Sequence, residues 1–124
     1  MLKVVIDRTK WLRGEEANQF GSSLLCPHSG KYCCLGFAAK EAGATDDEIR
    51  DLSTPGALWL TVGKTITESL LRSDRDESKE MNSNLSEALM EINDSTDPDV
   101  DAAFREAEVI RLGLEAGIEF SFVN

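Results

Sequence analysis

Apolar and polar residues alternate at both ends of this chain. Every second residue is apolar in the segment 2–6 (LKVVI) and again in the segment 118–122 (IEFSF). A period of two predicts a β-strand with one buried face in each segment. Two short strands make a marginal sheet unless they pair with each other and are covered by helices. We therefore expect an α+β fold in which the two terminal strands are neighbours in one small sheet.

Signals for short helices lie between the two strands. Three segments place a capping residue three positions before a glutamate, as in the first turn of a helix: 45–48, 65–68 and 84–87. The third segment leads into an apolar stripe at helical spacing, formed by Leu85, Ala88, Leu89 and Ile92. The apolar segment 34–42 ends before Gly43 and predicts a further buried helix, in which Gly36 allows close packing.

A longer helix is predicted near the C-terminus. Asp97 as the cap, Pro98 at the first helical position and further acids in the first turn mark its start. Its spacing predicts a core face made of Val100, Ala103, Phe104, Ala107, Ile110 and Leu114. Upstream, residues 72–84 hold one apolar residue in thirteen and predict a mobile loop. The whole pattern predicts a single domain over 1–124.

Length and composition agree with one small domain. The chain has 124 residues, and no apolar run approaches the roughly 18 to 20 residues that a membrane span needs. The segment 2–6 is too short for the apolar core of a signal peptide, so we expect a cytoplasmic protein without a membrane partner. Three cysteines are an odd number, which favours reduced thiols over a disulfide framework.

The charge is negative and unevenly distributed. The formal net charge is −10, of which residues 1–40 carry +3 and residues 41–124 carry −13. This sign argues against direct binding to nucleic acid or anionic lipid. The two parts can form separate faces only if the fold keeps the cations at 8–13, 31 and 40 away from the acidic stretches 46–51 and 91–101. We expect that separation if the charge asymmetry has a function; the alternative is an ordinary solvated surface that keeps a small protein soluble.

Two motifs approach known ligand loops but depart from them. The segment 63–65 (GKT) lacks the glycine that a phosphate loop needs at position 58, so Thr65 is better explained as a helix cap. Ala102 stands where a calcium loop needs a glycine, although four acids match its positions 1, 3, 5 and 12: Asp97, Asp99, Asp101 and Glu108. We expect neither ligand and no cofactor.

Thiols and the single histidine cluster within nine residues, which raises two further possibilities. A zinc site would use Cys26 and His28 with Cys33, but the spacings C-x-H and C-C are not those of structural zinc sites. Alternatively, Cys33 or Cys34 at a helix N-terminus could act as a nucleophile, with His28 as its base. We favour buried structural thiols and a loop histidine over both possibilities.

Several motifs together resemble a known protein family. They are Trp11-Leu12-Arg13-Gly14, the segment 30–36 (GKYCCLG), Asn93-Asp94 and the segment 117–123 (GIEFSFV). In this combination the chain resembles a family of small proteins encoded by tailed bacteriophages and prophages. The resemblance implies an accessory product in the bacterial cytoplasm, a class in which small acidic proteins bind and inhibit host or defence proteins. It implies no catalytic residue or cofactor.

These observations favour a non-enzymatic protein that acts by binding a host or phage protein. The interaction candidates are charged residues and one tryptophan: Arg8, Lys10, Trp11, Arg13, Asp97, Asp99 and Asp101. A thiol- or metal-dependent enzyme and a structural, virion-associated protein stay open as alternatives. Imitation of DNA is disfavoured, because the N-terminal third is basic.

Overall fold

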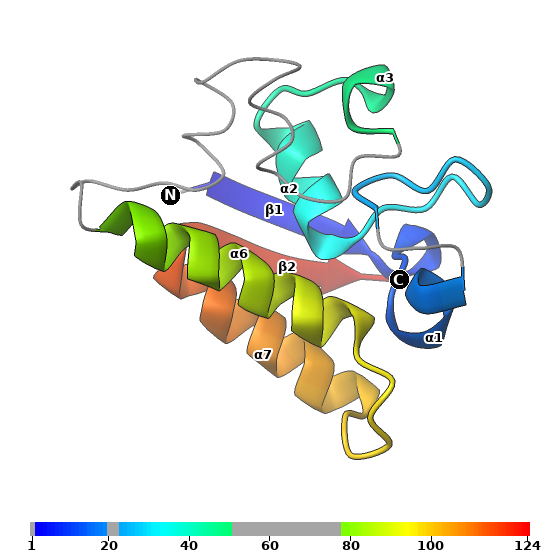
Figure 1. Cartoon of the computed structure of the whole chain (residues 1–124). Coiled ribbons are helices and arrows are strands. Elements are labelled where there is room, and N and C mark those ends of the chain that lie inside the picture. Colours follow the sequence, from blue (N-terminus) through cyan, green and yellow to red (C-terminus); the bar gives the residue numbers. More distant parts are fainter. Residues whose placement is uncertain (1, 20–22, 51–77) are drawn as a thin grey trace.

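The two terminal strands form one sheet, as the alternation predicts. A computed structural model describes residues 2–19, 23–50 and 78–124 (Figure 1). Strands β1 (Leu2–Asp7) and β2 (Ile118–Val123) are parallel. The inward residues are at most 3% exposed, and they are Val4, Ile6, Ile118 and Phe120. The α+β prediction is therefore confirmed, and the parallel orientation is a feature that the alternation does not specify.

Helices cover one face of this sheet. After β1 come a short 3-10 turn (Arg8–Lys10) and the helices α1 (Gly14–Gln19), α2 (Cys34–Glu41), α3 (Asp46–Ile49), α6 (Ser78–Asp94) and α7 (Ala102–Glu115). Helix α2 packs against β1 and α7 against β2, while α6 contacts both helices. Figure 1 shows α6 and α7 side by side. Within the described ranges, no helix is long and apolar enough to cross a membrane.

The predicted starts of α2 and α3 are confirmed by their contacts. Thr45 and Glu48 form a reciprocal capping box, in which each side chain accepts a hydrogen bond from the other residue's backbone N–H. A Cβ atom at Gly36 would collide with the carbonyl oxygen of Leu24, so this glycine lets α2 approach the neighbouring chain closely. The predicted cap at 65–68 lies outside the described residues.

Helix α6 begins earlier than the sequence predicts. Its predicted stripe is confirmed, since Leu85 and Leu89 are buried and the other two members are partly buried. However, the helix starts at Ser78, so residues 78–84 are helical and not part of a loop. Asn84 is therefore inside the helix rather than its cap. The polar composition that predicted a loop is compatible with a helical backbone, and residues 72–77 lie outside the described residues.

Helix α7 differs from its prediction in both its start and its buried face. Asp101, not Asp97, is the cap, and its carboxylate accepts a hydrogen bond from the Phe104 N–H at 2.8 Å. Phe104 and Leu114, predicted as core, are 48% and 47% exposed. The buried residues are Arg105, Val109, Leu112, Gly113 and Ala116. Because this buried stripe contains an arginine and a glycine, the pattern of apolar residues did not identify it as the core face of the helix.

Candidate functional site

Cys33 and Cys34 lie in the core at the start of α2. Cys33 is the N-cap, and its sulfur accepts a hydrogen bond from the Gly36 N–H. Burial raises the pKa of the Cys33 thiol to about 12, and it raises the pKa of Cys34 as well. Both side chains are at most 1% exposed, which confirms that at least one of them is packed in the core. Burial of this kind favours the protonated thiol at neutral pH, whereas the nucleophilic form is the thiolate.

Cys26 and His28 occupy a tight turn, and Cys26 belongs to a smaller buried cluster than Cys33 and Cys34 do. The turn is closed by hydrogen bonds from the Cys26 N–H to Lys31 and from the Gly30 N–H to Cys26. Burial raises the pKa of the Cys26 thiol, but hydrogen bonds from Ser29 and from the His28 backbone outweigh burial, so its pKa lies below the ordinary value. Among the described residues, no three His, Cys, Asp or Glu side chains are grouped so that they could hold a metal ion.

The acids that match a calcium loop have structural roles around the start of α7. Asp97 accepts a hydrogen bond from the Asp99 N–H at 2.9 Å, and Asp101 caps the helix. Glu108 is about two turns further along and pairs with Arg111 at 2.6 Å. The structure therefore spreads these acids from the segment before α7 to the middle of the helix rather than around a common centre. The phosphate-loop segment 63–65 lies outside the described residues.

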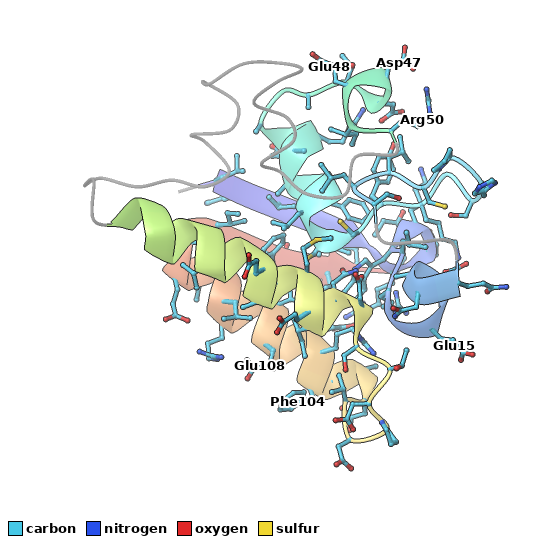
Figure 2. The ribbon with its side chains drawn as sticks, viewed as in Figure 1. Glu15, Asp47, Glu48, Arg50, Phe104 and Glu108 are labelled. Atoms are coloured by element: carbon cyan, nitrogen blue, oxygen red, sulfur yellow. The ribbon has the colours of Figure 1, made fainter. Side chains whose placement is uncertain are left out.

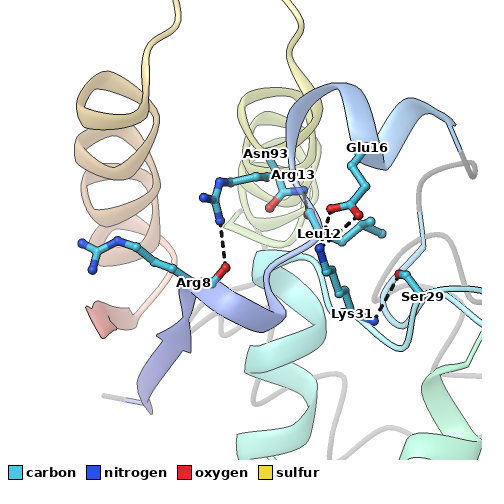
Figure 3. Close-up of polar contacts among 7 residues, drawn as sticks. All are labelled: Arg8, Leu12, Arg13, Glu16, Ser29, Lys31 and Asn93. Carbon is cyan, nitrogen blue, oxygen red and sulfur yellow. Dashed lines mark hydrogen bonds and ion pairs between the residues drawn. The ribbon is translucent and has the colours of Figure 1, made fainter. Parts of the chain in front are cut away.

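The basic candidates lie where β1 leaves the sheet (Figure 3). Arg8 makes two hydrogen bonds of 2.7 Å to the Glu106 carboxylate and also lies over the Phe122 ring. Arg13 lies 4.5 Å above the Trp11 ring and donates to the carbonyl oxygen of Arg8. Trp11 itself is only 2% exposed. Trp11 is thus a core residue, and both arginines make their contacts within the fold.

The expected separation of charge is wrong. Lys40 pairs with Asp46 at 2.8 Å, because α2 and α3 are joined by a short turn that brings these side chains together. The Lys40 ammonium and the Tyr32 hydroxyl hold the pKa of Asp46 below its usual value. Lys31 likewise pairs with Glu16 (Figure 3). Lys40 therefore lies beside the acidic stretch 46–51, whereas the acid that pairs with Lys31 belongs to residues 1–40.

Asn93 joins the segments that carry the family resemblance. Its side-chain oxygen accepts hydrogen bonds from the Trp11 indole N–H at 2.8 Å and from the Cys34 backbone N–H at 3.0 Å. Its amide nitrogen donates to the carbonyl oxygen of Leu12 at 2.9 Å and to Asp94. Phe122, in the last motif, lies 5.1 Å from Trp11. Four separate motifs thus meet around one fully buried amide.

The sequence analysis missed this role, although a signal for it exists. Asn93 follows Leu89 by four positions, so it falls on the apolar stripe of α6. A polar residue on a buried stripe must find hydrogen-bond partners, and Asn93 finds all of them within the protein. Arg105 is a similar case on α7, where its guanidinium donates to three backbone carbonyl oxygens around the end of α6.

The face of α7 opposite its buried stripe is apolar and exposed. We call it the outer face of α7, and it comprises Ala103, Phe104, Ala107, Arg111 and Leu114. With about 100° of rotation per residue, Ala103, Ala107 and Leu114 lie about 120–180° around the helix from Val109 and Leu112. Phe104 lies at the edge of this face, about 140° from Val109 and about 80° from Leu112. Figure 2 shows Phe104 and Glu108 on the side of α7 turned away from α6. Helix α7 therefore has two apolar sides, of which the fold buries one.

Comparisons of the chain with family models, with curated proteins and with solved structures give no match.

Proposed function

We propose that this chain is a phage-encoded accessory protein that acts by binding another protein, and that the outer face of α7 is its contact surface. The observation that carries the proposal is the exposure of Phe104 and Leu114 on one side of one helix. Large apolar side chains that share an exposed face are typical of protein interaction sites. The likeness of the motifs to small phage and prophage proteins supports a host or defence protein as the partner.

The chemistry of the thiols supports binding over catalysis by Cys33 or Cys34. Their burial favours the neutral thiol, and the buried hydrogen bonds around them hold α2 against α6. The candidates Arg8 and Trp11 are also engaged within the fold, through Glu106 and Asn93. Lys10 and the three aspartates before α7 are exposed, and one of the aspartates, Asp101, is the N-cap of α7.

The proposal is tested by capture from a bacterial extract with matched variants. The test variant is Phe104→Gln with Leu114→Gln, and the control is Val5→Gln, which changes a residue that is 55% exposed on the open face of the sheet. Glutamine suits a helix, so the thermal midpoint of the test variant should stay within about 3 °C of the wild type.

We expect the wild type and the Val5→Gln control to capture the same protein, and the α7 variant to lose it. Identification by mass spectrometry and cross-linking to α7 would place the contact on this helix. Identical capture by all three proteins would refute the proposal, because truncating the two exposed apolar side chains would then have no effect on binding.

A further inference from the structure

The apolar residues on the outer face of α7 are bordered by acids. Glu108 and Glu115 lie next to Phe104 around the helix, and the exposed acids at its N-terminal end are Asp97, Asp99 and Asp101. Asp97 and Asp99 precede the helix, Asp101 caps it, and Glu108 and Glu115 flank the apolar residues. A partner that covers Phe104 and Leu114 therefore approaches a surface of negative potential.

The arginines of α7 neutralise only part of this border. Arg105 is buried and its guanidinium is bound to backbone carbonyl oxygens at the end of α6. Arg111 is exposed, but it already bonds to Glu108 at 2.6 Å and to Glu115 at 3.2 Å. With Arg111 paired to two acids in its own helix, the outer face keeps a net negative charge.

These features define the chemistry of the occupant. Phe104 and Leu114 are ten residues apart, which is about 15 Å along the helix axis, a distance that another helix of about three turns can follow. A second copy of the chain would bring the same acidic border and a net charge of −10 against this one, so like charges would oppose it. A basic helix meets no such repulsion.

We infer that the outer face of α7 binds a basic amphipathic helix of its partner protein. The apolar residues of that helix cover Phe104 and Leu114, and its Lys or Arg side chains pair with the acidic border. The inference rests on the proposed function, to which it adds the partner's chemistry.

The test uses the full chain and a fluorescent synthetic peptide of about 18 residues, with leucines on one helical face and lysines on the other. Two further peptides serve as controls. One has the same composition in an order that destroys the apolar face, and the other has glutamate in place of lysine. Fluorescence anisotropy measures binding, and sedimentation velocity measures self-association of the chain.

We expect the amphipathic lysine peptide to bind at least about tenfold more tightly than either control peptide. The Phe104→Gln, Leu114→Gln variant should bind it at least about tenfold more weakly, whereas Val5→Gln should bind it as the wild type does. Asp101→Asn with Glu115→Gln should also weaken binding and reduce its salt dependence. Asparagine keeps the helix cap, so that variant should stay folded.

Three outcomes would overturn the inference. The first is equal binding of the lysine peptides with and without an apolar face, or binding that the α7 variant does not change. The second is no binding of the lysine peptide at all. The third is a dimer of the chain that the α7 variant abolishes, since the occupant would then be a second copy.

The inference and the proposed function can fail separately. Capture of an acidic or non-helical partner that depends on Phe104 and Leu114 would refute the inference alone. Capture that does not depend on Phe104 and Leu114 would refute the proposed function, whether or not the lysine peptide binds.

Discussion

Replacing Asn93 should be among the most damaging single changes in the described part of this protein. Asn93→Leu keeps a side chain of similar size but removes the amide. The Trp11 indole N–H, the Cys34 N–H and the Leu12 carbonyl oxygen then lose a partner at a fully buried position. A buried polar group left without a partner costs about 1–3 kcal/mol. Leucine offsets part of this loss through its own apolar surface.

The expected net loss is about 3–5 kcal/mol in the free energy of unfolding. This is a large share of the 5–15 kcal/mol that is typical of a small domain. Urea denaturation followed by circular dichroism measures it. With a slope of about 1–3 kcal/mol/M, the midpoint should fall by at least about 1 M urea.

Asn18→Ala is the matched control. The Asn18 amide also donates to backbone carbonyl oxygens, those of Gly14 and Asp94, but its side chain lies at the surface. Its loss should cost less than about 1 kcal/mol, because water can replace the bonds. A loss of less than about 1 kcal/mol for Asn93→Leu as well would refute the reasoning, since the hydrogen bonds of Asn93 would then not hold α6, α2 and the Trp11 segment together.

Three further expectations follow from other contacts. In chemical denaturation, Gly36→Ala should lower the free energy of unfolding by at least about 2 kcal/mol, because the Cβ of the alanine would come within 2.8 Å of the Leu24 carbonyl carbon. A loss below about 1 kcal/mol would contradict this, since the backbone would then move apart at little cost. Hydrogen bonds from Arg8 lower the pKa of Glu106 below 4.5, so the stability from this carboxylate is present above pH 4.5 and is lost as the pH falls through its lowered pKa. In thermal unfolding, the midpoint of Glu106→Gln should therefore lie below that of the wild type at pH 7. The two midpoints should be equal at a pH below the lowered pKa of Glu106, and a difference that is independent of pH would contradict this. A thiol reagent at pH 8 should label Cys33, whose pKa burial raises to about 12, only after denaturation, and rapid labelling of the native protein would contradict its burial.

Local pattern was enough to predict the strands and some helix starts. Alternation with a period of two identifies which residues of a strand share a face, and Val4, Ile6 and Phe120 are indeed buried. The Thr45 capping box depends on side chains only three residues apart. Such features were predictable because both partners lie close together in the sequence. The parallel orientation of the strands was not, since it depends on the path of the whole chain between them.

The tertiary structure alone decided which side of α7 is buried and what meets at Asn93. Helix α7 has one apolar stripe through Phe104 and another through Val109, and only its packing on α6 and β2 selects the second. Arg105 is acceptable on that buried side because the end of α6 supplies carbonyl oxygens to its guanidinium. Similarly, the amide of Asn93 is satisfied by Trp11, about eighty positions away. The apolar stripe of α6 indicates that Asn93 faces the core, but the partners of its amide are brought together only by the fold, so no local pattern could have predicted them.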